Sequence, residues 1–388
     1  MKRAHGGPPT SAPKPPRRTS RYRPVTATMI ACLLIVPVAP AAADPPIPAL
    51  MPAVGTHFHA LWTSYSAAER IEVLDKLAAA GVDWVRIDIG WATIQEQGPD
   101  WYSDWYIDQA DAVIDAAGER GINVLGLLWR TPSWANGGEG PSAPPDDPDD
   151  YGRIARWAAE HFRGRVAAWE VWNEPNQNAF WTGSARDVAR LLRASYDDFK
   201  TGDPDAEVVM PAPAYNDVAW LRDVYAAGAQ GFFDVMATHP YMAPSNLPPE
   251  MDTGTTWDIS SVERVRALME ENGDGDKPIW FTEVGWSSHP NSGDEAPWEL
   301  GVTKEQQADF LARAVRFVAC RFPYVEQIFW YSERDLGAPH GAGPDQIQLG
   351  NYGLLAEDLD PKPAYEAMSE IASGPGITFC PGITVQGP

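Results

Sequence analysis

From residue 54 onward, short apolar runs with strand character alternate with helical patterns, and the alternation repeats eight times. Eight consecutive strand and helix units predict parallel strands joined by right-handed crossovers, and the simplest way to close them is a (β/α)₈ barrel. An open, doubly wound sheet is the alternative, but no glycine-rich fingerprint follows the first run. We therefore predict an α/β fold, a TIM barrel that forms a single catalytic domain over residues 54–374.

The first unit shows the pattern. Residues 54–59 form a short apolar run, a helix over 67–80 has Ile71, Leu74 and Leu77 on one face, and Gly81 ends that helix. The expected strands are 54–59, 83–91, 123–129, 169–176, 206–211, 232–241, 279–286 and 325–331. The expected helices are 67–80, 106–119, 150–162, 185–200, 220–227, 261–271, 305–322 and 362–371.

The fourth expected strand, residues 169–176, ends in a carboxyl group next to an amide. The strand breaks at Pro175, so Asn173 and Glu174 lie where strand becomes loop. Trp169 and Trp172 flank the position and should remove much of its water. Because burial disfavours the charged form, we expect the pKa of Glu174 to be raised, and this makes Glu174 a candidate general acid.

The seventh expected strand supplies a second carboxyl group in a similar setting, Glu283. Hydrogen bonds and charge from Arg86 and Tyr241 would keep Glu283 ionised, so that it can act as a nucleophile. Two carboxyl groups at strand ends are the minimum needed to cleave a glycosidic bond. A separation of about 5 Å would mean a retaining, two-step reaction, and a separation of about 8 Å would mean inversion.

Further side chains are expected at the same end of the barrel, where (β/α)₈ enzymes place their active sites. The long loop over 131–148 makes Trp129, just before it, and Trp134, within it, candidate substrate contacts, since indole rings stack on sugar rings. Asn173 could hydrogen-bond a sugar 2-hydroxyl, and Trp330 could form the floor of a subsite. The candidate substrate-binding residues are Asn173, Arg86, His239, Tyr241, Trp330, His59, Trp91, Trp129 and Trp134.

Several of these residues have an equally simple structural interpretation. The histidines can be hydrogen-bonded core residues, and Trp91, Trp129 and Trp134 can be core packing. Glu170 lies on the same strand face as Glu174, so it points into the barrel and is expected to make a structural ion pair or hydrogen bond. Asp88 and Trp172 are also interpreted as structural.

The first 43 residues resemble a secretory signal peptide. Seven Lys and Arg side chains and no acidic ones lie in residues 1–24, an apolar stretch follows to Pro40, and residues 41–43 are alanines. We expect export to the extracellular space or cell wall after cleavage following Ala43; an uncleaved membrane anchor is the alternative. A proline-rich segment over 44–53 would precede the barrel, and residues 375–388 would form a tail.

Charge and cysteine content limit the possible partners. Loss of the seven basic side chains would change the net charge from −23 to −30. An acidic surface disfavours nucleic acid and anionic membranes, so we expect a neutral carbohydrate substrate and a monomeric protein. No metal-ligand spacing or phosphate-binding loop is present, so the sequence indicates no metal and no other cofactor. Cys320 and Cys380 could form a disulfide, as exported proteins allow.

The motifs together resemble a known group of enzymes. Asn173-Glu174-Pro175, His239-Pro240-Tyr241, Thr282-Glu283-Val284 and Arg86 look like those of the retaining glycoside hydrolases of clan A, especially families 5 and 39, in a secreted actinobacterial form. The resemblance covers residues 54–374. It implies a (β/α)₈ barrel with the strand-four glutamate as acid/base and the strand-seven glutamate as nucleophile, in agreement with the roles assigned above.

Specificity stays open at this level. A β-xylosidase or endo-glucanase and a galactofuranosidase or arabinofuranosidase acting on cell-wall glycan would share the same fold and carboxyl pair. A carbohydrate-binding pseudoenzyme would keep the groove without turnover. A barrel hydrolase with a non-carbohydrate substrate would be favoured if the two carboxyl groups lay more than about 10 Å apart.

Overall fold

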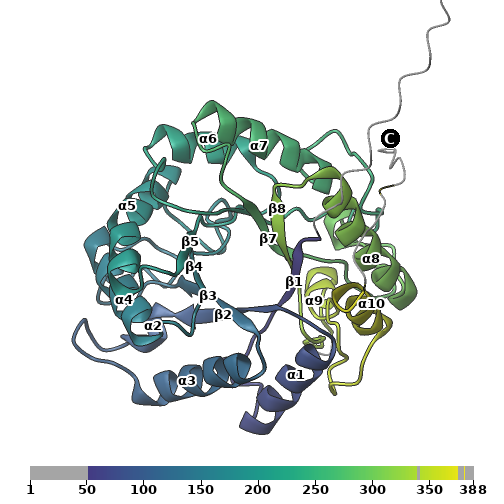
Figure 1. Ribbon diagram of the computed structural model, residues 1–388, viewed down its shortest axis with the longest axis horizontal. Coiled ribbons are helices and arrows are strands. Elements are labelled where there is room, and N and C mark those ends of the chain that lie inside the picture. Colours follow the sequence, from purple (N-terminus) through teal and green to yellow (C-terminus); the bar gives the residue numbers. More distant parts are fainter. Residues whose placement is uncertain (1–50, 339–340, 375–379, 381–388) are drawn as a thin grey trace, which may run out of the picture. The chain divides into compact units, whose positions relative to one another are not determined.

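The computed structural model describes residues 51–338, 341–374 and 380, and they include an eight-stranded parallel barrel surrounded by helices (Figure 1). The strands are β1 (Ala53–His57), β2 (Trp84–Gly90), β3 (Asn123–Trp129), β4 (Ala168–Val171), β5 (Glu207–Val209), β6 (Met236–Thr238), β7 (Ile279–Val284) and β8 (Val325–Trp330). Each strand is followed by at least one helix. The prediction of a TIM barrel is confirmed.

The helices of the outer ring are long and amphipathic. They are α1 (Ala67–Ala79), α3 (Asp104–Glu119), α4 (Pro148–His161), α5 (Ala185–Gly202), α6 (Val218–Ala226), α7 (Val262–Glu271), α8 (Lys304–Arg321) and α10 (Pro363–Ala372). Their starts follow from local chemistry: at α5, for example, Ser184 and Asp187 cap each other's backbone amides. The buried face of α5 includes Leu191, Leu192 and Phe199.

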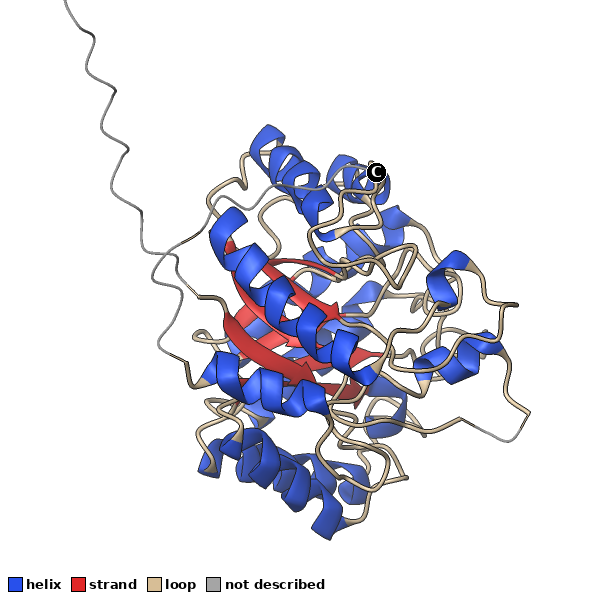
Figure 2. Ribbon diagram, turned by 90° about the vertical axis from the view of Figure 1, so that its right-hand side faces the viewer, coloured by secondary structure: helices blue, strands red, loops and turns tan. Residues whose placement is uncertain are grey.

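Four short elements lie in loops and were not predicted. They are α2 (Trp91–Ile94), α9 (Pro344–Leu349) and the 3₁₀ turns η1 (Ile259–Ser261) and η2 (Pro297–Glu299). None is longer than six residues, so none has the sustained period that makes a helix recognisable in a sequence. Figure 2 shows that many of the loops gather beyond the arrowheads of the strands, at their carboxyl ends.

The strands are hydrogen-bonded in the order β5-β4-β3-β2-β1-β8-β7-β6. Between β5 and β6 the contact shortens to a bridge from Val209 to Val235, supported by a hydrogen bond from the Met210 amide to the Val235 carbonyl at 2.9 Å. This short contact closes the ring. The prediction extended the sixth strand to residues 232–241, whereas β6 has only three residues.

Two hydrophobic clusters result from the alternation of side chains along the strands. The smaller cluster fills the inside of the barrel with residues such as Leu125, Trp280 and Phe329. The larger cluster lies between the strands and the helices. Gly55 has no room for a side chain, because a Cβ atom there would lie 2.7 Å from the Phe329 ring. The packed interior leaves the polar side chains of the strands to gather at the carboxyl ends.

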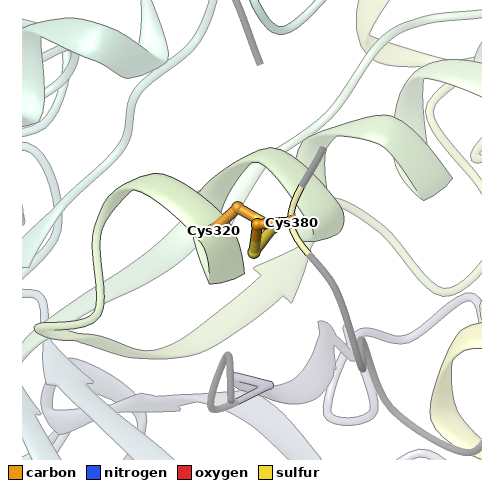
Figure 3. Close-up of a disulfide and its surroundings, with 2 residues drawn as sticks. All are labelled: Cys320 and Cys380. Atoms are coloured by element: carbon orange, nitrogen blue, oxygen red, sulfur yellow. A yellow bond between two sulfur atoms is a disulfide. The ribbon is translucent and has the colours of Figure 1, made fainter. Parts of the chain in front are cut away.

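A disulfide joins Cys320, near the end of α8, to Cys380, with the two Cα atoms 5.6 Å apart (Figure 3). The remaining residues of the expected tail, and the expected signal peptide over 1–43, lie outside the described residues. So does most of the expected proline-rich segment over 44–53. Among the helices that are described, none has both the length and the apolarity needed to cross a bilayer.

Candidate active site

A cavity of about 480 Å³ opens at the carboxyl ends of the strands. Both predicted carboxyl groups, Glu174 and Glu283, line it, and so do Asn173 and Tyr241. These side chains come from the ends of β4, β6 and β7. The site therefore lies at the end of the barrel where the βα loops meet.

The backbone at the end of β4 is strained, and the strain determines which side chains reach the cavity. Trp172 and Glu174 have positive φ angles of 68° and 40°, a region that residues other than glycine rarely adopt. Strict alternation would direct Trp172 inward along with Glu170. Instead the Trp172 ring packs against Trp181 in the outer core, and both Asn173 and Glu174 face the cavity.

Glu283 is held by hydrogen bonds on both carboxylate oxygens. Arg86 Nη1 donates to Oε1 at 2.6 Å, and the Tyr241 hydroxyl donates to Oε2 at 2.9 Å. These are the two partners that the sequence suggested. A register irregularity in β7 next to β8, between Phe281 and Val284, accompanies the placement of Glu283 at the mouth.

Arg86 is completely buried and connects the side chains of Glu283, Glu170 and Asn173 below the cavity. Besides Glu283 it donates through Nε to Glu170 Oε2 at 2.6 Å and through Nη2 to Asn173 Oδ1 at 2.8 Å. Glu170 also accepts a hydrogen bond from the Thr282 hydroxyl at 2.9 Å. The prediction that Glu170 makes a structural ion pair is confirmed, and the planar guanidinium orients the carboxylate of Glu283 and the amide of Asn173 at once.

His239 links Glu174 to the same network and locates a proton. Because the Thr282 hydroxyl donates to Glu170, its oxygen is left to accept from His239 Nε2 at 3.0 Å. A neutral His239 then has an unprotonated Nδ1, which lies 2.8 Å from Glu174 Oε1. For this contact to be a hydrogen bond, either a protonated Glu174 donates to Nδ1, or the proton lies on Nδ1 and His239 donates to an ionised Glu174. Either form keeps one proton between the two side chains.

The two carboxyl groups are driven to opposite charge states. Burial raises the pKa of Glu174, and repulsion from Glu283 adds to this, against the opposing effect of His239 and Arg86. Burial would also raise the pKa of Glu283, but the nearby side chains of His239 and Arg86, with a contribution from His57, lower it well below its ordinary value. One group is suited to carry a proton and the other to carry a charge, which is the separation that acid and nucleophile require.

The structure brings some of the predicted binding residues to the cavity and keeps others away from it. His59, Trp129, Asn173 and Tyr241 line the cavity. Arg86 and His239 have no exposed surface. They contact the two carboxyl groups, so their place in the site is to position other side chains and not to touch a substrate.

Three of the tryptophans that were predicted to bind substrate do not lie at the cavity. Trp91 is fully buried at the start of α2, Trp134 donates its indole N–H to the Gln95 carbonyl, and Trp330 is 2% exposed with its ring stacked on Trp286. None of the three lines the cavity. The alternation along β8 explains the last case: Phe329 points into the barrel, so Trp330 points outward to the helices.

Other cavity residues were missed by the sequence reasoning. Asp88, interpreted as structural, lines the cavity and lies 3.1 Å from His57 Nε2. It is two residues after Arg86 on the same strand face, so period-two alternation could have found it. Tyr331, one residue beyond Trp330, lines the cavity where Trp330 was expected. Tyr215, Trp257 and Trp298 come from long loops, where the sequence carries no comparable signal.

Two groups of side chains are close enough to share a metal ion: His57 with His59 and Asp88, and Glu174 with His239 and Glu283. In the second group both oxygens of Glu283 already accept hydrogen bonds, and the guanidinium of Arg86 lies 2.6 Å away. In the first group Asp88 raises the pKa of His57 to about 9, although burial alone would lower it. A protonated imidazole cannot bind a metal, so both groups fit hydrogen bonding better than coordination.

Replacing Arg86 should destabilise the fold through the charges that it leaves behind. We expect Arg86→Met to lower the free energy of unfolding by about 3–5 kcal/mol, because the buried Glu170 and Glu283 lose their common cation. Urea denaturation at neutral and acidic pH would measure the loss. It should shrink as the pH falls through the lowered pKa of Glu283, because a protonated carboxyl group needs no cation.

Arg86→Lys is the matched control, since it keeps a positive charge but lacks the planar fork. The Lys variant should be more stable than Arg86→Met, because the charge is kept. It should not orient Glu283 and Asn173 together as Arg86 does. A loss of stability in Arg86→Met that is the same at every pH would show that packing, and not charge, is what Arg86 contributes.

An eight-stranded parallel barrel with two carboxyl groups at the ends of β4 and β7 defines the class of this protein: it is a glycoside hydrolase of clan A. The sequence profile of cellulase (glycosyl hydrolase family 5) matches residues 48–320. The chain belongs to this family.

Individual relatives are more distant. The chain is 23% identical over 254 residues to a β-xylosidase from Geobacillus stearothermophilus, a match that covers 60% of this chain and 47% of the relative, or about half its length. A family 39 glycoside hydrolase structure from Bacteroides cellulosilyticus is similar with a TM-score of 0.64 and 24% identity, over 83% of this chain and 64% of the other. A GH5_18 structure from Streptomyces cattleya, in complex with Manβ1-4GlcNAc, has a TM-score of 0.65 and 20% identity over 85% and 83%.

Proposed function

We propose that this protein is a retaining glycosidase that hydrolyses O-glycosidic bonds of a neutral glycan, with Glu283 as nucleophile and Glu174 as general acid and base. The observation that carries the proposal is the distance between the two groups: carboxylate oxygens of Glu174 and Glu283 lie within 4.8 Å of each other, with His239 beside both. Retaining enzymes need a gap of about 5 Å, whereas inverting enzymes need room for a water molecule between the carboxyl groups.

In the first step Glu283 attacks the anomeric carbon while Glu174 gives its proton to the glycosidic oxygen. The bond from that carbon to the leaving oxygen breaks, and a glycosyl ester forms on Glu283. In the second step the ionised Glu174 takes a proton from water, the water oxygen attacks the anomeric carbon, and Glu283 leaves as a carboxylate. His239, 2.8 Å from Glu174, can stabilise either protonation state of the acid/base group during this cycle.

Asn173 is placed to bind the sugar undergoing cleavage. Its Oδ1 is already used by Arg86, so the side-chain amide N–H groups are left to donate into the cavity that Asn173 lines. Such a donor next to Glu174 suits a 2-hydroxyl of the substrate, a contact that strengthens in the transition state. Arg86 fixes this amide and Glu283 together, which ties the sugar position to the nucleophile position.

The configuration of the first-formed product tests the proposal. We expect proton NMR of an aryl glycoside reaction to show the anomer of the substrate as the first sugar product, before it mutarotates. A first product with the opposite configuration would rule out the double displacement. Because relatives are named for β-xyloside cleavage or solved with a β-linked mannosyl disaccharide, aryl β-xylosides and β-mannosides are the first substrates to test, with aryl furanosides as the second panel.

We also propose that the protein is exported. The basic and apolar leader over residues 1–43 supports this, as does the disulfide between Cys320 and Cys380, because disulfides persist in oxidising compartments. Mass spectrometry of the protein from the culture medium should find a chain that begins at Asp44. A full-length protein retained in the cell membrane would support the uncleaved anchor instead.

A further inference from the structure

The exposed large apolar side chains among the described residues cluster around two hollows. They are Trp62, Ile71, Trp105, Trp298 and Leu349, with exposed fractions from 39% to 61%. Trp62, Trp298 and Leu349 line the active-site cavity, and Trp105, the most exposed of the five, lines a second hollow. Only Ile71 belongs to neither. Single exposed apolar side chains are common, but exposed apolar side chains that line a hollow are typical of ligand-binding grooves.

The second hollow has a volume of about 420 Å³ and is lined by residues 61–64, Thr93, Trp105 and Tyr106. Trp62 also lines the active-site cavity, so the two hollows share this side chain as a common wall. The loop after β1 supplies residues 61–64, α2 supplies Thr93, and the first turn of α3 supplies Trp105 and Tyr106. A ligand long enough to cross Trp62 would occupy both.

Trp62 is held in position although its ring is partly uncovered. Its Nε1 donates to Asp88 Oδ2 at 3.2 Å, and its ring centroid lies 4.2 Å from that of His59. Trp105 is the second residue of α3, so the helix fixes its backbone, and its neighbour Tyr106 anchors this turn by accepting a hydrogen bond from the Gly90 amide at 2.9 Å. A ring that is held as Trp62 is loses little freedom when a ligand stacks on it.

The lining of the hollow points to the chemistry of its ligand. No charged side chain is among the lining residues, in a protein that has 53 acidic and 30 basic side chains. Thr63, Ser64 and Thr93 add hydroxyl groups to the lining, and the Ser64 hydroxyl, which accepts from Arg334 Nη2 at 3.2 Å, can still donate. Indole rings accompanied by hydroxyl groups suit a sugar ring, which has apolar C–H faces and a hydroxyl rim, and they offer no partner to a phosphate backbone or a charged peptide.

We propose that the hollow between Trp62 and Trp105 binds additional sugar units of a neutral glycan chain whose bond is cleaved in the active-site cavity. This rests on the proposed function of that cavity. Trp62 contacts Asp88, Asp88 contacts His57, and His57 Nδ1 lies 3.5 Å from Glu283, so the hollow extends the nucleophile side of the site. Its occupants belong to the part of the chain that becomes attached to Glu283. The preferred substrate is therefore a chain cut at an internal bond, not a single terminal sugar.

Replacing Trp105 tests this proposal without touching the catalytic groups. We expect Trp105→Ala to lower kcat/KM about tenfold for oligosaccharides of five or more units and to leave kcat/KM for an aryl glycoside of one unit within about twofold. The oligosaccharide series is made of the sugar whose aryl glycoside the wild type hydrolyses. Ile71→Ala, which removes an exposed apolar side chain outside both hollows, is the matched control and should change neither value.

Binding measured without turnover separates this proposal from the proposed function. In a Glu283→Gln background, calorimetry with xylo-, manno- and galactofurano-oligosaccharides of six units should show a Kd about tenfold weaker when Trp105→Ala is added, with no change for the matching disaccharides. If Trp105→Ala weakened binding of the six-unit ligands only, but the wild type hydrolysed none of them, the enzyme assignment would be wrong and the hollow would still be a glycan-binding site. Equal effects of Trp105→Ala on short and long ligands, or no effect on either, would overturn the proposal for the hollow.

Discussion

Glu283→Gln should lower kcat for aryl glycosides by about 10⁵-fold, because an amide of the same shape cannot form the glycosyl ester. The substitution leaves an oxygen that can still accept from Arg86 Nη1 and an amide group that can still meet the Tyr241 hydroxyl. The fold and the substrate pocket should therefore survive. Initial rates with a series of aryl glycosides, together with the melting temperature of the variant, measure both expectations.

Glu170→Gln is the matched control for this variant. Glu170 is also a buried carboxylate bonded to Arg86, with its oxygen 2.6 Å from Nε, but it has no exposed surface in the cavity. Its replacement removes the same charge from the same network and should cost no more than about 100-fold in kcat. If Glu283→Gln retained more than about one hundredth of the wild-type rate, or if Glu170→Gln were the more severe change, the nucleophile would have to be sought elsewhere.

Trapping provides a second measurement of the same role. A 2-deoxy-2-fluoro glycoside with a good leaving group should react once and leave its sugar attached to the protein. The fluorine slows both steps, but the good leaving group speeds up only the first, so the glycosyl-enzyme accumulates. Peptide mapping by mass spectrometry should then find the sugar on Glu283. A label on any other side chain would contradict the assignment.

The barrel could be predicted from the sequence because its signal is repeated. Each strand has an apolar run, and most strands are followed by an amphipathic helix. One uncertain unit among eight therefore does not change the predicted fold. Individual boundaries depend on weaker signals. The run over 232–241 is apolar and continuous, but its first residues lie before β6 and its last residues, including His239 and Tyr241, lie in the loop at the mouth.

In the candidate site, too, some residues could be predicted from the sequence and others could not. Glu174 and Glu283 come from strand ends, Arg86 from the middle of β2 and Tyr241 from the loop after β6. A polar side chain in or next to an apolar run is conspicuous in a sequence, and the structure brings all four together. Tryptophans were harder to place, because an indole suits the core and a sugar platform equally well. The strained φ angle of Trp172 could not be predicted from the sequence, although it allows both Asn173 and Glu174 to face the cavity. Trp62 and Trp105 lie on loop and helix-start positions without any pattern.

Glu174→Ala should show a loss of rate that depends on the leaving group. Substrates whose leaving group needs a proton, such as alkyl glycosides and natural glycans, should lose about 10³- to 10⁴-fold in kcat/KM. Dinitrophenyl glycosides should lose little in kcat/KM, because their leaving group departs without protonation. Their kcat should fall, since no base remains to activate water for the second step, and the glycosyl-enzyme should accumulate.

Azide and pH then distinguish loss of the acid/base group from general damage to the site. Azide needs no base, so it should restore kcat of Glu174→Ala on dinitrophenyl glycosides and give a glycosyl azide with the configuration of the substrate. Wild-type activity should fall as the pH rises through the raised pKa of Glu174, because the proton that the leaving group needs is lost. On alkyl glycosides, whose leaving group needs the proton, Gln177→Ala, a neutral cavity neighbour, should keep this fall, whereas Glu174→Ala should lack it. Equal losses for both leaving groups, with no response to azide, would mean that Glu174 only maintains the shape of the pocket and that another group, with His239 the nearest, supplies the proton.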